Sequence, residues 1–234
     1  MVSVLRIYKK TSFFICALYI CIFASSAQAS TKILVWGDSL SAAYGIPVKK
    51  GWVNLMQEKL GDSVKIINGS ISGETTQGGL TRLPAALQNH MPNLVILALG
   101  ANDGLRGISP QISKRNLEQM ILKSKQAGAE IALLGIKIPP NYGPAYTEKF
   151  EEQFVTLASD YQLPFIPFFL ENIVGKSSNF QADQLHPTAE AQPLILETIL
   201  PVLETVLEAK LNSAPEPDAN ENPTQTTKEE IMTH

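Results

Sequence analysis

Short apolar runs alternate with longer segments of helical spacing along most of the chain. The runs are rich in aliphatic and β-branched side chains, as the buried strands of parallel sheets are. They cover residues 33–36, 64–67, 94–99, 131–134 and 165–166. Between them, apolar side chains recur at helical intervals, at Leu80, Leu83 and Leu87 and again at Ile112, Leu117, Met120 and Ile121. This alternation predicts an α/β domain with a parallel sheet of about five strands, covered on both faces and centred on residues 94–99.

The last periodic segment predicts a helix whose apolar stripe packs against the sheet. The stripe consists of Leu196, Ile199, Leu200, Leu203, Val206, Leu207 and Leu211. Pro193 and Pro201 lie near or within it, so an offset start or a kink is expected.

The first 29 residues have the pattern of a secretion signal. Arg6, Lys9 and Lys10 precede an apolar run over residues 13–24, and small residues end in the A-x-A sequence of residues 27–29. The apolar run is shorter than the roughly 20 residues that a membrane-spanning helix needs, which disfavours the alternative of an uncleaved anchor. Cleavage after Ala29 leaves 205 of the 234 residues and predicts a secreted protein.

Loss of this segment changes the chemistry that the chain can perform. Cys16 and Cys21 both lie in it, so the mature chain would hold no disulfide, thiolate metal site or cysteine nucleophile. A lipid-modified Cys21 is disfavoured because Ile20, and not a small residue, precedes it. The mature chain keeps 16 basic and 22 acidic residues, a net charge of −6, which argues against nucleic acid as a partner.

The other end of the chain predicts a disordered acidic tail over residues 212–234. This segment is rich in Pro, Asn, Glu and Thr, and Ile231 and Met232 are its only apolar side chains larger than alanine. Such a segment buries too little surface to offset its ordering entropy. The folded domain is therefore expected to span residues 30–211.

Four polar, glycine-containing segments follow predicted strands. They are residues 37–40, 68–73, 100–104 and, after a longer loop, 183–187. In an open parallel α/β sheet, the carboxyl ends of the strands form the edge at which ligands bind. We therefore expect the four segments to open on the same edge.

These segments contain the residues of a candidate nucleophilic site. A serine such as Ser39 needs a base, and the chain has three histidines. His234 ends the predicted tail and His90 precedes the strand at 94–99, at the wrong end of the sheet. His186 remains, and Asp183 lies three residues before it, close enough to orient the imidazole.

Acyl transfer also requires donors that face the developing oxyanion. The candidates are the backbone N–H of Ser39, expected to open a helix, the backbone N–H of Gly73 and the side-chain amide of Asn102. Pro187 fits the first position of a following helix and would make the turn at His186 rigid.

Each of these residues also has a structural interpretation. Ser39 could cap a helix, Gly73 and Asn102 could serve only turns, Asp183 could be a solvated loop residue and His186 a residue at a helix start. Because these residues occur in order, each after a predicted strand, a common functional site is favoured over five independent structural roles.

Four short blocks resemble those of the GDSL/SGNH hydrolases: Ser39 in GDSL, Gly73 in SGET, Asn102 in GAND and His186 in DQLHP. The longer stretches ILVWGDSLSAAYGI, LALGANDGLRG, IPPNYGPAY and DQLHPTAEAQP are similar to the periplasmic thioesterase, lysophospholipase and arylesterase branch of this family. The similarity spans residues 32 to about 207 and omits the tail.

The resemblance implies a flavodoxin-like α/β/α domain in the periplasm that needs no metal or cofactor. Ser39 would be the nucleophile, His186 the base and Asp183 its orienting acid. Ser39, Gly73 and Asn102 would form the oxyanion hole. The substrate would be a small-molecule acyl ester, thioester or lysophospholipid, and a monomer without a stable membrane span suffices.

The resemblance also suggests where acyl chains bind. Residues 104–109, with two glycines and Ile108, are a candidate mobile flap in contact with the substrate. Ile138 is a candidate acyl-chain contact or, equally well, a buried strand-end residue. Pro139 and Pro140 stiffen the neighbouring loop, which leaves the chain-length preference open.

Two rival functions remain at this point. A carbohydrate O-deacetylase of the same superfamily would use the same catalytic residues with a polar, short-chain pocket. A non-catalytic secreted binding module could keep the fold, but it would have no need for an activated serine.

Overall fold

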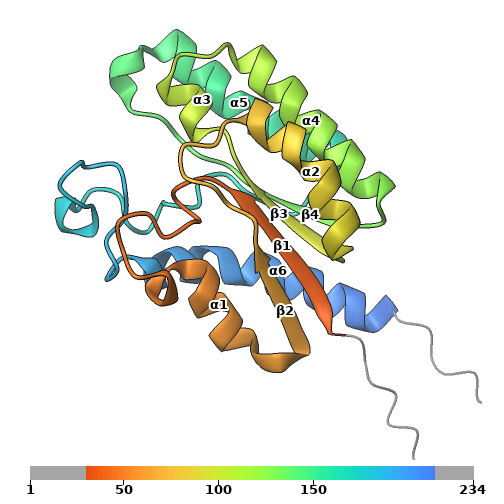
Figure 1. Ribbon diagram of the computed structural model, residues 1–234. Helices are drawn as coiled ribbons and strands as arrows, with labels where there is room; N and C mark the ends of the chain where they lie inside the picture. The colour runs from red at the N-terminus through yellow and green to blue at the C-terminus, as the bar shows by residue number, and fades with distance from the viewer. Residues whose placement is uncertain (1–29, 214–234) are drawn as a thin grey trace, which may run out of the picture.

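Five parallel strands form the centre of the molecule, in the order β2-β1-β3-β4-β5 (Figure 1). They are β1 (Thr31–Gly37), β2 (Val64–Asn68), β3 (Leu94–Ala98), β4 (Glu130–Leu134) and β5 (Phe165–Ile166). Each predicted run is a strand, and β3 lies in the middle of the sheet, which confirms the predicted α/β class. The computed structural model describes residues 30–213, so the predicted signal segment and residues 214–234 of the predicted tail lie outside the described residues.

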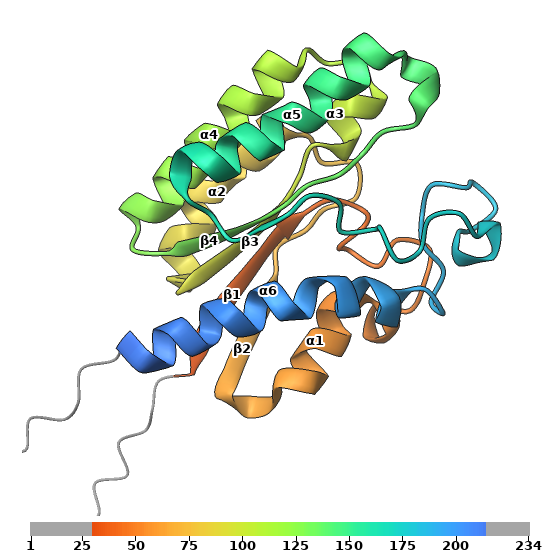
Figure 2. The ribbon, with the colours of Figure 1, turned by 180° about the vertical axis from the view of Figure 1, so that it is seen from behind.

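Helices cover both faces of the sheet and make a three-layer α/β/α sandwich (Figures 1 and 2). One face carries α2 (Thr76–His90), α4 (Pro110–Gln126) and α5 (Pro144–Tyr161), and the other carries α1 (Trp52–Leu60) and α6 (Gln192–Ser213). The short helix α3 (Ala101–Leu105) follows β3 directly. The remaining elements are single 3-10 turns: η1 (Val48–Lys50), η2 (Gly61–Ser63), η3 (Pro140–Tyr142) and η4 (Ser177–Asn179).

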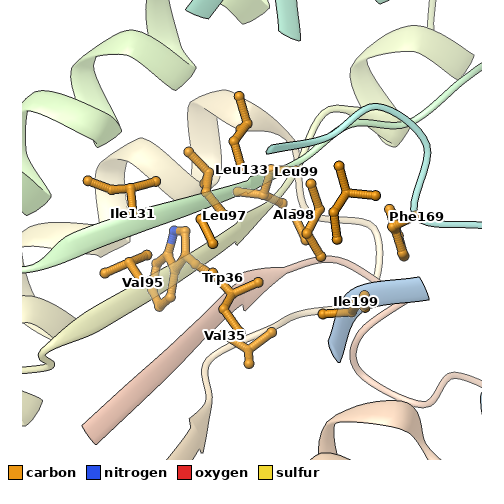
Figure 3. Packing of buried hydrophobic residues seen from close by; sticks show 14 of the residues in the cluster. Val35, Trp36, Val95, Leu97, Ala98, Leu99, Ile131, Leu133, Phe169 and Ile199 are labelled. Atoms are coloured by element: carbon orange, nitrogen blue, oxygen red, sulfur yellow. The ribbon is translucent and has the colours of Figure 1, made fainter. Parts of the chain in front are cut away.

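The core is built from rows of side chains that cross neighbouring strands. Trp36 of β1 is in register with Leu97 of β3, which is in register with Leu133 of β4, so the three lie on one face (Figure 3). The Trp36 indole N–H donates to the carbonyl of Gly79 in α2 at 3.1 Å, which identifies this face as the one covered by α2. Both faces of β3 and of β1 from Ile33 onward are buried, and this explains why these residues are apolar.

Helix α6 buries most of the predicted stripe: Leu207 is half-buried, and the side chain of Leu211 lies outside the described ones. The side chains of Leu196, Ile199, Leu200, Leu203 and Val206 are all buried. Pro193 lies in the first turn, where its missing N–H costs no hydrogen bond, and the helix continues past Pro201. It ends at Ser213, two residues beyond the predicted end of the domain.

The segments that follow the strands all lie at the same end of the sheet, opposite the end where β1 starts and α6 stops (Figures 1 and 2). They bring Ser39, Gly73 and Asn102 to one edge, and the long connection from β5 to α6 brings His186 to the same edge. Among residues 30–213, no helix is long and apolar enough to cross a membrane.

Candidate active site

A serine, a histidine and an aspartate form a chain of hydrogen bonds at this edge. His186 Nε2 lies 2.9 Å from Ser39 Oγ, and His186 Nδ1 lies 2.7 Å from Asp183 Oδ2. Ser39 and His186 are separated by 147 positions, and only the fold brings them together. The structure therefore brings the three residues predicted from the sequence into contact.

The Asp183 carboxylate is held by the turn that contains His186. Its Oδ1 accepts from the backbone N–H groups of Leu185 at 2.9 Å and His186 at 3.0 Å, while Oδ2 faces the imidazole. Gln184, between them, has φ +56°, so the turn bends through the left-handed region. These backbone bonds, chiefly that from His186, lower the pKa of Asp183 to about 2, although the side chain is exposed.

Two contacts fix the His186 loop against the segment after β1. Gln181 Nε2 donates to the carbonyl oxygens of Tyr44 at 2.8 Å and Pro187 at 3.0 Å. The Tyr44 ring packs on His186 with centroids 4.4 Å apart. Sequence reasoning missed both residues, since neither periodicity nor spacing indicates a contact across 137 positions.

Two local predictions about this site were wrong. Pro187 does not start a helix: it forms an isolated antiparallel bridge with Phe180, and α6 begins only at Gln192. Ser39 does not open a helix either, because the chain after β1 makes successive turns in which Asp38 O accepts from the N–H groups of Ser41 and Ala42. In both places, contacts with another segment determine the backbone.

The three predicted oxyanion donors are available at this edge. Within residues 30–213, the backbone N–H groups of Ser39 and Gly73 meet no hydrogen-bond acceptor. Asn102 Nδ2 donates to Glu74 O at 3.0 Å and lies 3.4 Å from Asp38 Oδ2, a long contact that leaves its second hydrogen weakly held. The two backbone donors are therefore free to receive a negatively charged oxygen, whereas the Asn102 amide would exchange its long contact with Asp38 for one.

Gly73 has a conformational reason to be glycine. It is the third residue of a turn closed by the hydrogen bond from Glu74 N to Ile71 O, and its φ is +78°. A type II turn requires a positive φ at this position, which side chains other than glycine adopt at a cost. A Cβ there would meet only the Arg106 guanidinium, 3.9 Å away, so its α-carbon faces open space.

Asp38, directly before Ser39, is a buried carboxyl that sequence reasoning did not single out. Its Oδ1 accepts from the Leu40 N–H at 3.0 Å, and Oδ2 lies near the Asn102 amide. Burial raises the pKa of Asp38 to about 7, against the opposing effects of the Leu40 hydrogen bond and of His186. Asp38 and Asp183 therefore differ strongly in how readily they ionise, although both lie near His186.

The candidate acyl-chain residues differ in burial. Ile138 is buried, and a Cβ on Gly104 would lie 2.5 Å from its Cγ2, so it packs tightly on α3. This packing favours its interpretation as a buried strand-end residue. Ile108 is half-buried, and its carbonyl accepts from Tyr146 Oη at 2.7 Å.

The predicted flap at residues 104–109 is partly helical, since Gly104 and Leu105 belong to α3. Hydrogen bonds from Tyr142 Oη to Leu105 O and from Tyr146 Oη to Ile108 O, both at 2.7 Å, hold it against η3 and α5. In the described part of the chain, no group of three or more His, Cys, Asp or Glu side chains is placed to hold a metal ion.

A serine and a histidine in hydrogen-bond contact, at the carboxyl edge of a parallel sheet, are the arrangement expected of a serine hydrolase. The comparisons with known proteins agree with this class. Residues 35–193 match the model of the GDSL-like Lipase/Acylhydrolase family, and the chain belongs to this family.

Relatives with high similarity are named for ester hydrolysis. An arylesterase of Vibrio mimicus is 47% identical over 185 residues, 78% of this chain and 92% of that protein. The thioesterase 1/protease 1/lysophospholipase L1 of Escherichia coli (strain K12) is 38% identical over 190 residues, 81% of this chain and 91% of that protein. The crystal structure of the psychrotrophic esterase EstA from Pseudoalteromonas sp., inhibited by monoethylphosphonate, matches with a TM-score of 0.72 and 43% identity, over 76% of this chain and 99% of that one.

The burial of Asp38 predicts a pH-dependent stability. Because its pKa rises from 3.8 to about 7 on folding, the folded chain binds this proton more tightly than the unfolded chain. The resulting contribution is complete below about pH 4 and is lost as the pH rises through about 7, by at most about 4 kcal/mol. Asp38→Asn removes the titrating group, so the variant should gain stability relative to the natural chain between pH 4 and pH 8, measured by urea unfolding. The exposed Asp62→Asn is the control, and a difference for Asp38→Asn that does not change with pH would contradict the assignment.

Proposed function

We propose that this chain is a serine esterase that hydrolyses esters and thioesters of acyl chains through an acyl-enzyme on Ser39. His186 acts as the base and Asp183 orients it. The observation that carries the proposal is the continuous contact from Ser39 Oγ through the imidazole to the Asp183 carboxylate, at 2.9 and 2.7 Å. The names of the relatives support the same chemistry.

The first half of the reaction forms the acyl-enzyme. Asp183 accepts a hydrogen bond from the His186 Nδ1–H, which fixes the tautomer in which Nε2 is the acceptor for the Ser39 hydroxyl proton. As that proton moves to Nε2, Ser39 Oγ attacks the carbonyl carbon. The carbonyl oxygen becomes an oxyanion that accepts from the N–H groups of Ser39 and Gly73 and from the Asn102 amide.

Collapse of the first tetrahedral intermediate completes the acyl-enzyme: the imidazolium protonates the departing alcohol or thiol and acyl-Ser39 remains. The second half regenerates the serine. Water then attacks the acyl carbon while His186 takes its proton, and collapse of the second intermediate returns that proton to Ser39 Oγ and releases the acid. Every proton moves through Nε2, so no cofactor enters the sequence.

The surroundings of Ser39 support an apolar acyl chain as the group that is transferred. Three large apolar side chains are exposed on the loops that carry the site: Tyr44 at 50%, Ile71 at 47% and Leu185 at 44%. Tyr44 touches His186, Leu185 is adjacent to it, and Ile71 lies two residues before Gly73. Ile71 and Leu185 offer no hydrogen bond to a carbohydrate, whereas an acyl chain gains from the burial of all three side chains.

The amino-terminal sequence supports a periplasmic location. A basic start, a short apolar run and the A-x-A sequence ending at Ala29 form a cleavable secretion signal. The described residues begin at Ser30, and β1 begins at Thr31, directly after the predicted cleavage position.

Removing either end of the hydrogen-bonded chain should abolish most of the activity. Ser39→Ala should not react with a fluorophosphonate probe, and Asp183→Asn should lower kcat for p-nitrophenyl butyrate by about 10³- to 10⁴-fold because the imidazole loses its orienting acceptor. Asp160→Asn, exposed on α5, is the matched control. Equal labelling of natural protein and Ser39→Ala would overturn the assignment, and no labelling of the natural protein would favour a binding module.

The acyl-chain preference tests the substrate class. Across p-nitrophenyl esters of two to twelve carbons, kcat/KM should rise beyond acetate. Ile71→Ser and Leu185→Ser should each lower kcat/KM for the longer esters by about three- to tenfold and leave acetate nearly unchanged, since burial of each side chain is worth about 1 kcal/mol. Val155→Ser, at an exposed position of α5, is the control. A steep preference for acetate would instead favour the carbohydrate O-deacetylase.

Secretion should produce a defined new amino terminus. When the full chain is expressed in a Gram-negative host, the periplasmic protein should begin Ser30-Thr31-Lys32, as read by amino-terminal sequencing. Ala29→Leu, which removes a small residue of the A-x-A sequence, should block processing. An intact Met1 on membrane-bound natural protein would indicate an anchor helix.

A further inference from the structure

A buried polar contact outside the Ser39–His186–Asp183 chain joins two of the strand-exit segments. The carboxyl group of Asp103 in α3 accepts two hydrogen bonds from Thr76, the first residue of α2: from its backbone N–H at 2.8 Å and from its hydroxyl at 2.5 Å. Both side chains are almost inaccessible, at 1% and 0% exposed. A carboxyl group without partners in such a place would be strongly destabilising, so the pairing is essential to its position.

The contact is anchored from a third element. Asn116 of α4 donates its side-chain amide to Thr76 Oγ1 at 3.0 Å, so the hydroxyl accepts one hydrogen bond and donates another. The Thr76 N–H is one of the free donors at the start of α2, and a carboxyl group placed there also interacts favourably with the helix dipole. Thr76 and Asp103 thus have one well-defined arrangement relative to each other.

The Thr76–Asp103 pair lies close in the sequence to two of the proposed oxyanion donors. Asp103 directly follows Asn102, and Thr76 follows Gly73 by three residues. Two further hydrogen bonds join the same segments: Asn102 Nδ2 to Glu74 O at 3.0 Å and Arg106 Nη2 to Gly73 O at 3.1 Å. Arg106 is exposed and Asn102 half-buried, so the Thr76–Asp103 pair is the most water-protected of these connections.

We propose that Thr76 and Asp103 are positioning residues that set the distance between the Gly73 N–H and the Asn102 amide, and thereby hold the oxyanion hole in its working geometry. The inference rests on the proposed function, because it assumes that these two groups stabilise the oxyanion. Donors act on the transition state only within a few tenths of an ångström of the right place. A link between the two segments therefore affects kcat more than KM.

The test is a kinetic comparison of Thr76→Val, which removes only the hydroxyl, with Thr76→Ser, which retains it. Thr76→Val should lower kcat for p-nitrophenyl butyrate about 10- to 100-fold with KM changed less than about threefold, and Thr76→Ser should recover kcat to within about threefold. Thr81→Val, whose hydroxyl donates to Gln77 O on the exposed face of α2, is the matched control. If Thr76→Val folds poorly, Asp103→Asn is used instead. The NH₂ group of the new amide cannot accept the hydrogen bond that the Thr76 hydroxyl donates to Asp103, and that hydroxyl already accepts one from Asn116.

A double-mutant cycle separates positioning from general support of the fold. In an Asn102→Ala background, Thr76→Val should lower kcat less than about threefold further, because the donor that it positions is gone. Equal losses of kcat in both backgrounds, or a lower Tm with kcat unchanged, would overturn the proposal. Ser39→Ala, measured in parallel, tests the proposed function itself: if it retains full activity the proposed function fails, whereas an inactive Ser39→Ala beside a fully active Thr76→Val rejects only the positioning role.

Discussion

The parallel pairing of β1 with β2 and β3 is the constraint on which the site depends. Val35 pairs with Asn68 on one side, and Gly37 pairs with Ala98 on the other. Because the three strands run in the same direction, the segments that follow them start side by side, and each contains one of the proposed oxyanion donors. An antiparallel neighbour of β1 would place its exit at the far end of the sheet. The site therefore depends first on the parallel direction of these strands and only then on the individual side chains.

Burial on both faces also explains how much of the fold could be predicted. The parts of a strand that are covered on two sides are apolar, so residues 33–36 of β1 and the whole of β3 are recognisable in the sequence, and the leucine spacing identifies α2. The site residues were predictable because four short blocks each follow a strand. Site residues that directly follow strands can be identified in the sequence, because their positions relative to the predicted strands are visible there.

Contacts between segments that are far apart in the sequence were not predictable. The bridge from Pro187 to Phe180 replaced an expected helix start, and the packing of Tyr44 on His186 has no local signal. The same holds for the Thr76–Asp103 pair, because Asp103 looks like an ordinary turn aspartate until the fold buries it. In each of these places, partners that the sequence cannot identify determine the local structure.

Asp38 and Asp183 have the same side chain, but their different surroundings shift their pKa values in opposite directions. Backbone N–H groups keep Asp183 ionised despite its exposure, whereas burial disfavours the charged form of Asp38. Near neutral pH, Asp183 is therefore the fixed negative charge beside the imidazole, and in the proposed mechanism it would stabilise the imidazolium. An ionised Asp38 would bring negative charge next to the Asn102 amide, one of the proposed oxyanion donors. Because burial disfavours that ionised form, it limits the negative charge on this side of Ser39.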